Sequence, residues 1–265
     1  MVKLNTWVEA GYELDVLIVN YMNKTADYKL TIIVPVYNEE ENIYRLEGKL
    51  SAFVSQFLSM RICVLFVNDG STDGSGDLII DVCHHQENFF YINLKKNSGL
   101  SAALKAGIDT TWSTYIGYID ADLQTAPEDF NLLIPYLGEY EMVMGIRAKR
   151  DDQIVKRISS KIANGFRRFM TNDGIEDTGC PLKVMQTIYA KRIPLFTGMH
   201  RFLPALIQLQ NGKVKQVAVR HFPRMEGESK YNLRNRLFAP LFDCFVFRWM
   251  KKRYINYHIA ESNIE

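Results

Sequence analysis

Short apolar runs rich in β-branched residues alternate with segments of helical spacing through the first half of the chain. The runs occupy residues 30–36, 62–67, 91–94, 115–119 and 141–146. Between the first two runs, apolar residues recur with the spacing of a helix, at Ile43, Leu46, Leu50, Phe53 and Phe57. Alternating strands and helices are typical of a mostly parallel sheet covered on both faces. We therefore predict an α/β protein with an open, doubly wound sheet and with functional residues at the carboxyl ends of its strands.

Two of the loops that follow strands carry helix-start signals. Asn38 precedes Glu41 by three positions, and Thr125 precedes Glu128 by the same distance. A polar cap followed three residues later by Glu is the capping-box pattern, and Pro127 suits a first helical turn. The sequence thus predicts that two capped helices begin beside strand ends.

The second half of the chain is more basic, and its strands are harder to recognise. After residue 147, apolar residues share one predicted helical face at Ile154, Ile158, Ile162, Phe166 and Phe169. We expect three parts along the chain: an N-terminal extension over 1–27, a main domain over 28–232 with halves 28–146 and 147–232, and a basic amphipathic tail over 233–265.

Composition indicates a globular protein, because 47% of the 265 residues are hydrophobic. The cysteines lie far apart and show neither disulfide nor metal-binding spacing, at Cys63, Cys83, Cys180 and Cys244. The sequence shows no signal-peptide pattern, and no apolar run reaches the ~20 residues of a spanning helix. We therefore expect a cytosolic setting and a chain that does not cross a membrane by itself.

Basic charge is concentrated near the C-terminal end. Residues 213–253 hold eleven Lys or Arg and three acidic residues, whereas the net charge of the whole chain is only +2. Such a block is typical of a solvated helix face, a nucleic-acid site or a contact with an anionic membrane. Charge alone leaves all three open.

The apolar run 115–119 leads into two carboxylates and an amide, at Asp120, Asp122 and Gln124. In an extended segment, alternate residues such as these point to one side. Their oxygen atoms are ligands that Mg²⁺ and Mn²⁺ accept, and Mg²⁺ usually completes its shell with water and substrate phosphates. The segment predicts a divalent-cation site beside a nucleoside diphosphate, although a solvated turn that caps the next helix uses the same residue types.

Three further loops follow strands at the same expected edge: VPVYNEEEN (34–42), VNDGSTDGSGD (67–77) and KKNSGLSAALKAGI (95–108). Tyr37 offers an aromatic face on which a base can stack, and Glu39 and Asp69 can accept hydrogen bonds from a base or a ribose. The small residues of GSTDGSG allow the backbone to approach a ligand. Each loop alone is an ordinary turn sequence, but together they predict a nucleotide-binding crevice.

The motifs VPVYNEEEN, VNDGSTDGS and DADLQTAPEDF resemble the nucleotide-sugar-binding half of family 2 glycosyltransferases with the GT-A fold. The second half is similar to polyprenyl-phosphate glycosyltransferases, the group of dolichyl-phosphate mannose synthase, in VMGIRAKRDD (143–152), EDTGCPLKVM (176–185) and HFPRMEGESKYN (221–232). The resemblance covers about residues 29–236. It implies the GT-A fold and the inverting transfer of one sugar from a UDP- or GDP-linked donor to undecaprenyl or dolichyl phosphate.

The resemblance also implies roles for individual residues. A Mg²⁺ or Mn²⁺ ion is expected on Asp120, Asp122 and Gln124. Asp122 and Asp177 are expected to be catalytic, with Asp177 orienting the attacking phosphate or accepting its proton. Donor binding is expected at Pro35, Tyr37, Glu39, Asp69, Asp120 and Asp122. The acceptor phosphate is expected at Arg147, Lys161, Arg224, Ser229 and Lys230.

One of these positions departs from the family pattern. Lys161 stands where the family has an arginine, so it supplies charge without a planar fork.

The last predicted helix, within 233–253, suits a membrane surface. Apolar residues recur at helical spacing between basic ends, at Leu237, Leu241, Phe245 and Trp249. Several relatives continue into spanning helices here and this sequence does not, so we expect a peripheral enzyme on the cytoplasmic, inner face of the membrane. A small membrane-spanning partner protein is one means of recruitment. A helix packed on the sheet with a basic outer edge is the competing interpretation.

Three other functions fit part of the sequence. The main alternative is a family 2 enzyme that uses a sugar-hydroxyl acceptor in cell-surface polysaccharide or lipopolysaccharide synthesis, but GESKY (227–231) argues against it. A processive polysaccharide synthase is disfavoured, because Phe245 stands where its Gln-x-x-Arg-Trp signature requires Gln. A nucleic-acid-binding module lacks a known motif, so we expect no nucleic-acid partner.

Overall fold

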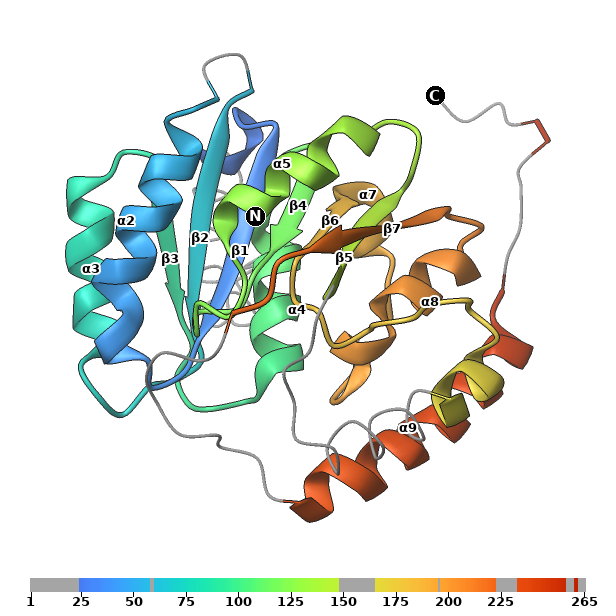
Figure 1. Ribbon diagram of the computed structural model, residues 1–265. Helices are drawn as coiled ribbons and strands as arrows, with labels where there is room; N and C mark the ends of the chain where they lie inside the picture. Colours follow the sequence, from blue (N-terminus) through green and yellow to red (C-terminus); the bar gives the residue numbers. More distant parts are fainter. Residues whose placement is uncertain are drawn as a thin grey trace, which may run out of the picture.

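The computed structural model describes residues 24–57, 60–147, 165–194, 196–222, 233–255 and 260–261. These residues form a seven-stranded sheet in the order β3-β2-β1-β4-β6-β5-β7 (Figure 1). The strand β6 is antiparallel to its two neighbours, and all other pairs are parallel. The strands are β1 (Leu30–Val36), β2 (Ile62–Asn68), β3 (Phe89–Asn93), β4 (Tyr115–Tyr118), β5 (Met142–Arg147), β6 (Lys183–Gln186) and β7 (Val214–Val219).

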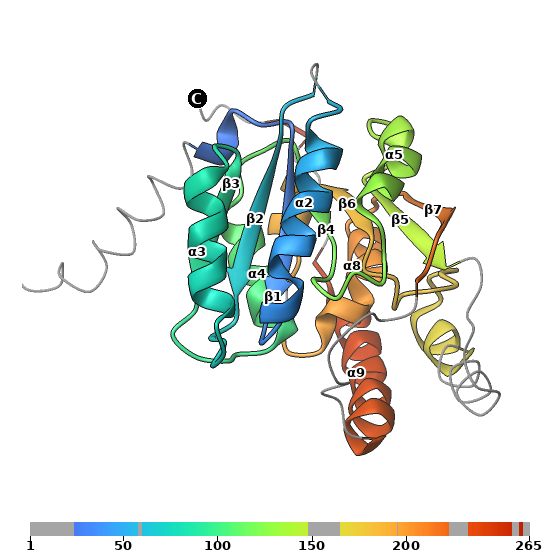
Figure 2. The same cartoon turned by 60° about the vertical axis from the view of Figure 1, so that its left-hand side comes forward.

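Helices cover both faces of the sheet, as Figures 1 and 2 show. One face carries α2 (Ile43–Val54), α3 (Ser75–His85) and α5 (Phe130–Leu133), and the other carries α4 (Leu100–Thr110), α7 (Thr187–Lys191) and α8 (Leu203–Leu209). Short 3₁₀ turns are η1 (Glu40–Asn42), η2 (Pro127–Asp129), η3 (Ile134–Tyr136) and η4 (Met199–Phe202). Two apolar cores result, one on each side of the sheet. Burial on both faces explains why β1 and β2 are nearly continuous apolar runs.

The five strands predicted from the apolar runs are confirmed, with ends that shift by up to two residues. The predicted inner face of α2 is confirmed as well, because Ile43, Leu46, Leu50 and Phe53 are fully buried. The strands β6 and β7 were not predicted. Lys183 interrupts the apolar pattern of β6, and β7 is a half-exposed edge strand with polar residues.

Both capping predictions are wrong. Asn38 has a left-handed φ of 52° and hydrogen-bonds the loop after β2, with Thr72 N–H donating to its Oδ1 at 2.8 Å. The turn η2 begins after Ala126 without a side-chain cap, and Thr125 Oγ1 is buried without a hydrogen-bond partner in the described part of the chain. Pro127 does occupy the first turn, as predicted. At Asn38, a contact between loops has therefore replaced local capping.

The helix α9 (Leu233–Arg253) lies on the side of the sheet where the parallel strands end (Figures 1 and 2). Cys244 and Phe247 are buried, and the Phe247 ring stacks on Phe202 with 5.5 Å between ring centroids. Lys251 Nζ donates to the carbonyl oxygen of Thr171 at 2.8 Å. The interpretation of a helix packed on the domain is thus right for one side of α9. Among the described residues, no helix is long and apolar enough to cross a membrane.

Candidate active site

Most of the predicted site residues in the described part of the chain lie at or just beyond the carboxyl ends of parallel strands. Tyr37 and Glu39 follow β1, Asp69 follows β2, Asp120 follows β4, and Arg147 is the last residue of β5. Pro35, within β1, is partly buried. The antiparallel strand β6 begins at this edge, so the loop that leads into it brings Asp177 to the same side. The topology therefore gathers residues that are more than a hundred positions apart in sequence.

The loop after β4 is a turn and is not the extended segment that the sequence argument assumed. Leu123 has a left-handed φ of 58°, and Gln124 N–H donates to Asp122 Oδ1 at 3.1 Å. This side-chain-to-backbone contact closes a tight turn, so alternation of side chains does not apply here. Asp120 and Asp122 nevertheless interact electrostatically. Convergence of Gln124 with them stays a prediction.

Burial is the main reason that the pKa of Asp120 rises to about 6, and the neighbouring Asp122 carboxylate raises it further. A hydrogen bond from Tyr118 and the charges of Lys183 and Arg147 partly offset the rise. Two close carboxylates of which one resists ionisation are the arrangement that a divalent cation relieves. The residues present therefore fit a hard cation.

The described residues contain no cluster of three or more His, Cys, Asp or Glu side chains that could hold a metal ion. A cation bound by Asp120 and Asp122 must complete its shell with other oxygens. Gln124, water and the phosphates of a nucleotide are of the right chemical type.

The predicted catalytic residue Asp177 and the predicted phosphate ligand Arg147 form a fork. Arg147 Nε donates to Asp177 Oδ2 and Arg147 Nη2 donates to Oδ1, each at 2.7 Å. Gly179 N–H also donates to Asp177 Oδ1, at 3.2 Å. A Cβ atom at Gly179 would lie 2.7 Å from Arg147 Nη2, so a side chain there would push the guanidinium away. A carboxylate engaged in this way orients an arginine well, but it is a weak proton acceptor.

We call the loops that follow β1, β2 and β3 the donor-side loops: 37–42, 69–74 and 94–99. Asp69 is buried and accepts hydrogen bonds from the backbone N–H groups of Ser98 and Gly99, both at 2.8 Å. Gly70 has a φ of 63°, and a Cβ atom on it would clash with the backbone of Lys96 at 2.4 Å. Glycine at position 70 therefore allows the loop after β2 to lie close against the loop after β3. The predicted role of Asp69 toward a base or ribose is untested.

The first two donor-side loops are joined in the same manner. Glu39 N–H donates to Ser75 Oγ at 2.9 Å, and Gly74 N–H donates to Glu40 Oε2 at 2.7 Å. The Glu39 side chain accepts from Asn42 Nδ2 at 2.9 Å. Many polar side chains of these motifs thus order the backbone of the crevice. The stacking role of Tyr37 stays a prediction.

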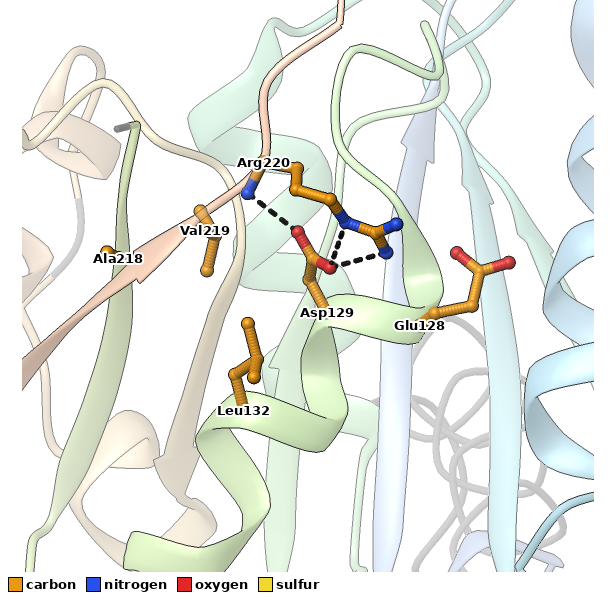
Figure 3. Close-up of a pocket in the computed structure, with 6 residues that line it drawn as sticks. All are labelled: Glu128, Asp129, Leu132, Ala218, Val219 and Arg220. Atoms are coloured by element: carbon orange, nitrogen blue, oxygen red, sulfur yellow. Dashed lines mark hydrogen bonds and ion pairs between the residues drawn. The ribbon is translucent and has the colours of Figure 1, made fainter. Parts of the chain in front are cut away.

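A second ion pair joins the loop after β4 to the end of β7 (Figure 3). Arg220 Nε donates to Asp129 Oδ1 at 2.7 Å, and the backbone N–H of Arg220 donates to Asp129 Oδ2 at 2.8 Å. Phe222 N–H donates to the carbonyl oxygen of Gln124 at 2.9 Å. The chain leaving β7 is therefore fixed against the Asp120–Gln124 loop. A pocket lies beside this pair, and its lining residues are Glu128, Asp129, Leu132, Ala218, Val219 and Arg220. None of them belongs to the predicted site.

The remaining predicted acceptor ligands lie outside the described residues: Lys161, Arg224, Ser229 and Lys230. The predicted helical face also falls partly outside them, at Ile154, Ile158 and Ile162. Of its other two members, Phe166 is partly buried and contacts Phe245. Phe169 is exposed, so the prediction that it shares an inner face with the others is wrong.

Two residues that the sequence argument missed lie beneath the site. Tyr118 O–H donates to Asp120 Oδ1 at 2.6 Å, and the Lys183 ammonium lies 5.3 Å from the centroid of the Tyr118 ring. Burial lowers the pKa of Lys183. A lysine inside an apolar run, as in GCPLKVM, is the signal that marks such a position, because a lysine is rarely buried without a partner.

His200 is part of the packing. Its Nδ1 lies 2.8 Å from Ser101 Oγ, and Gly198 N–H donates to the same oxygen at 3.1 Å. Burial, together with the charges of Arg201 and Lys183, lowers the pKa of His200 to about 3. The imidazole is therefore neutral near pH 7, and it connects α4 to η4.

Four aromatic residues on α9 and on the helical segment 165–171 are exposed, and we call them together the aromatic surface: Phe242, Phe245 and Trp249 of α9 and Phe169 of the segment. Their exposed fractions are 69%, 57%, 62% and 75%. Arg253 lies over the Trp249 ring, 5.3 Å from its centroid. Of the predicted lipid-facing set, Phe245 and Trp249 are exposed and Leu241 is partly buried, while the side chain of Leu237 lies outside the described residues.

The model of the family described as "Glycosyl transferase family 2" matches residues 31–191. The chain belongs to glycosyl transferase family 2. This span runs from the second residue of β1 to the end of α7, and it contains Asp120, Asp122, Arg147 and Asp177.

Two curated relatives are similar over most of this chain. Dodecaprenyl-phosphate galacturonate synthase of Rhizobium johnstonii is 30% identical over 81% of this chain and 65% of its own length. Undecaprenyl-phosphate 4-deoxy-4-formamido-L-arabinose transferase of Yersinia enterocolitica is 29% identical over 77% of this chain and 63% of its own length. The chain thus spans a little under two thirds of the length of these relatives.

Solved structures confirm the predicted GT-A fold class. Glucosyl-3-phosphoglycerate synthase from Mycobacterium tuberculosis, solved in complex with Mn²⁺, uridine diphosphate and glucosyl-3-phosphoglycerate, aligns with a TM-score of 0.62 at 16% identity. The alignment covers 92% of this chain and 86% of that chain. At this identity the likeness concerns the fold.

Proposed function

We propose that this family 2 enzyme transfers a single sugar, with inversion, from a nucleoside diphosphate sugar to a polyprenyl phosphate at a membrane surface. One observation carries the proposal. An acidic pair suited to a cation, Asp120 and Asp122, adjoins an arginine held in a carboxylate fork, Arg147 with Asp177, and the charge of Arg147 acts on Asp120. Such a site offers one place for a cation-bound diphosphate and one for a second phosphate.

On the donor side, Asp120 and Asp122 hold Mg²⁺ or Mn²⁺, with Gln124 as a further oxygen ligand. The ion, when bound, neutralises the charge that gathers on the departing diphosphate. The donor-side loops give the nucleoside a rigid crevice, because their polar side chains are hydrogen-bonded to neighbouring loops. Pro35, Tyr37, Glu39 and Asp69 surround the base and ribose in this proposal.

On the acceptor side, the attacking group is a phosphate oxygen. A phosphomonoester has a second pKa of about 6, so it is largely ionised at neutral pH and needs little help from a base. It needs placement against the repulsion of the donor's diphosphate. Arg147 supplies that placement, and Asp177 fixes the plane of its guanidinium. Lys161, Arg224, Ser229 and Lys230 are proposed as further ligands of the same phosphate.

The lipid tail of the acceptor requires contact with a bilayer. The helix α9, which carries three residues of the aromatic surface, lies on the side of the molecule where the parallel strands end, which is also the side of the site (Figure 2). Arg248, Lys252 and Arg253 of α9 are exposed as well, and Arg253 lies over the Trp249 ring. Exposed aromatic rings flanked by cations suit the headgroup region of an anionic leaflet. We propose peripheral attachment to the inner membrane face through this surface.

The direct test of the reaction is a panel of radiolabelled UDP- and GDP-sugars incubated with undecaprenyl phosphate or dolichyl phosphate, followed by extraction of labelled lipid. We expect label in the lipid fraction with one donor, and none for Asp122→Asn. Asp109→Asn is the matched control, because Asp109 is a surface carboxylate paired with Lys105 on α4. Label that enters only a sugar-hydroxyl acceptor would replace the proposal with the main alternative.

The membrane contact is tested by sedimentation with vesicles of neutral and of anionic phospholipid. Phe245→Ser combined with Trp249→Ser is expected to reduce binding to anionic vesicles at least tenfold, because two exposed rings are lost. Ile188→Ser is the control, since Ile188 is equally exposed but lies on α7, at the opposite end of the sheet. Unchanged sedimentation of the double variant contradicts the attachment through α9.

A further inference from the structure

Lys183 occupies an unusual position in the sheet. It is the first residue of β6 and lies opposite Tyr118 of β4 and Met144 of β5. Its side chain therefore belongs to the apolar core between the sheet and α4 and α8, and only 2% of the residue is exposed. A lysine is almost never this buried unless it is paired. The groups that contact the Lys183 ammonium should therefore explain why a charged side chain is buried in this core.

The Lys183 ammonium contacts two carbonyl groups and an aromatic ring. Nζ donates to the carbonyl oxygen of Cys180, and that of Thr178 lies 3.5 Å away. Both carbonyls belong to the loop that follows Asp177, and within it Gly179 N–H also donates to Asp177. Lys183 thus holds the backbone of the turn that presents Asp177 to Arg147.

The other side of the ammonium faces the Tyr118 ring, whose hydroxyl reaches the metal site. Tyr118 is buried, and its O–H donates to Asp120 Oδ1 at 2.6 Å. A short hydrogen bond to a carboxylate is among the stronger kinds and restricts rotation of the carboxyl group. The Tyr118 ring is fixed by its place in β4 and by the Lys183 ammonium beside it.

We infer that Tyr118 and Lys183 form a positioning pair that aligns the metal-binding carboxylate of Asp120 with the Asp177–Arg147 fork. The pair touches neither substrate: it acts through Asp120 on the donor side and through the 178–180 backbone on the acceptor side. This inference rests on the proposed function, because it gives Asp120 the role of a cation ligand.

The test is direct measurement of Mn²⁺ binding by calorimetry on the full chain in the presence of UDP. Tyr118→Phe removes only the hydroxyl, and we expect the Mn²⁺ dissociation constant to rise about tenfold, as for a lost hydrogen bond to a charged group. Transfer at saturating Mn²⁺ should fall far less. Tyr115→Phe is the matched control: Tyr115 lies at the other end of β4, also beside a lysine, with Lys29 Nζ 5.6 Å from its ring centroid.

A second pair of variants tests Lys183. Lys183→Met keeps the length and apolar stem but removes the donors, and it should raise both the Mn²⁺ dissociation constant and the KM for the lipid phosphate. Lys183→Arg should restore part of both, since it retains donors for the two carbonyls. If Lys183→Met fails to fold, Tyr118→Phe still decides the matter. A purely structural pair would lower the unfolding temperature and leave Mn²⁺ affinity unchanged.

The outcomes separate the two claims. If the wild-type chain binds no Mn²⁺ with UDP, the proposed function fails and the inference with it. If the wild-type chain binds Mn²⁺ and UDP, but the Mn²⁺ dissociation constant of Tyr118→Phe equals that of the wild type within error, the positioning role alone is wrong.

Discussion

The donor side and the acceptor side of the site are built with different chemistry. The donor-side loops are joined by hydrogen bonds between side chains and backbone, such as those of Asn38 and Asp69. The acceptor side relies on opposite charges held within hydrogen-bond distance, in the Asp177–Arg147 pair. Binding on the donor side therefore depends on the shape of the loop backbone, whereas binding on the acceptor side depends on charges held in fixed positions. Substitutions on the two sides should have separable effects.

The largest expected effect is on the acceptor side. Asp177→Asn leaves Arg147 without its charged partner and with one fork bond weakened, so kcat/KM for the lipid phosphate should fall about 100-fold through misplacement of the guanidinium. Binding of UDP with Mn²⁺ should hardly change, because Asp177 lies in the loop before β6, whereas the donor-side loops follow β1, β2 and β3. The measurements are transfer kinetics and UDP calorimetry on the same preparation.

The control for that variant is Asp129→Asn. It breaks a comparable pair, but the Arg220 side chain is 58% exposed, so solvent screening makes the loss small. An equal fall in both variants, or a matching loss of UDP binding in Asp177→Asn, would refute the separation of the two sides.

The next effect is on the donor side. Asp69→Ala removes the acceptor of two backbone N–H groups, and buried unsatisfied donors cost about 1–3 kcal/mol each. We expect the free energy of unfolding to drop by about 3 kcal/mol and UDP affinity to fall with it. Urea denaturation and UDP calorimetry measure the two quantities. Asp69→Asn should be milder, since an amide oxygen retains one acceptor. A variant that loses stability but keeps UDP affinity would show that the loop order is irrelevant to the nucleotide.

The smallest expected effect is the pH dependence of the metal site. Because burial and Asp122 raise the pKa of Asp120 to about 6, a proton competes with the cation below that pH and leaves as pH rises through it. The apparent Mn²⁺ affinity should therefore be about tenfold lower near pH 5 than near pH 7.5. Asp120→Asn should bind weakly and lose this slope. A wild-type affinity that is flat over the same range would contradict the coupling.

Sequence reasoning reached the donor side more completely than the acceptor side, and the reason is physical. A strand such as 30–36 is buried on both faces, so its apolar run and the polar loop after it can be recognised locally. The strand β6 is short, antiparallel and contains Lys183, so only its neighbours reveal it. The Asp177–Arg147 fork joins residues thirty positions apart, and no local pattern encodes that distance.

The local rules also misled in an instructive way. Asn38 and Thr125 have the spacing of helix caps, but Asn38 bonds Thr72 across the crevice and Thr125 caps no helix. Likewise, the alternation argument for Asp120, Asp122 and Gln124 assumed a strand where Leu123 turns the chain. A contact between loops decides the position of Asn38, and that contact is visible only when the sheet is assembled.

The central claim is that Asp120 and Asp122 hold a cation that carries a nucleoside diphosphate. Titration calorimetry of UDP and of GDP, each with and without Mn²⁺, tests it on the wild-type chain and on Asp122→Asn. The account predicts tight binding of one nucleotide that requires Mn²⁺ and is lost in Asp122→Asn, with Asp109→Asn unaffected. Nucleotide binding that is the same without Mn²⁺, or that survives in Asp122→Asn, would contradict it.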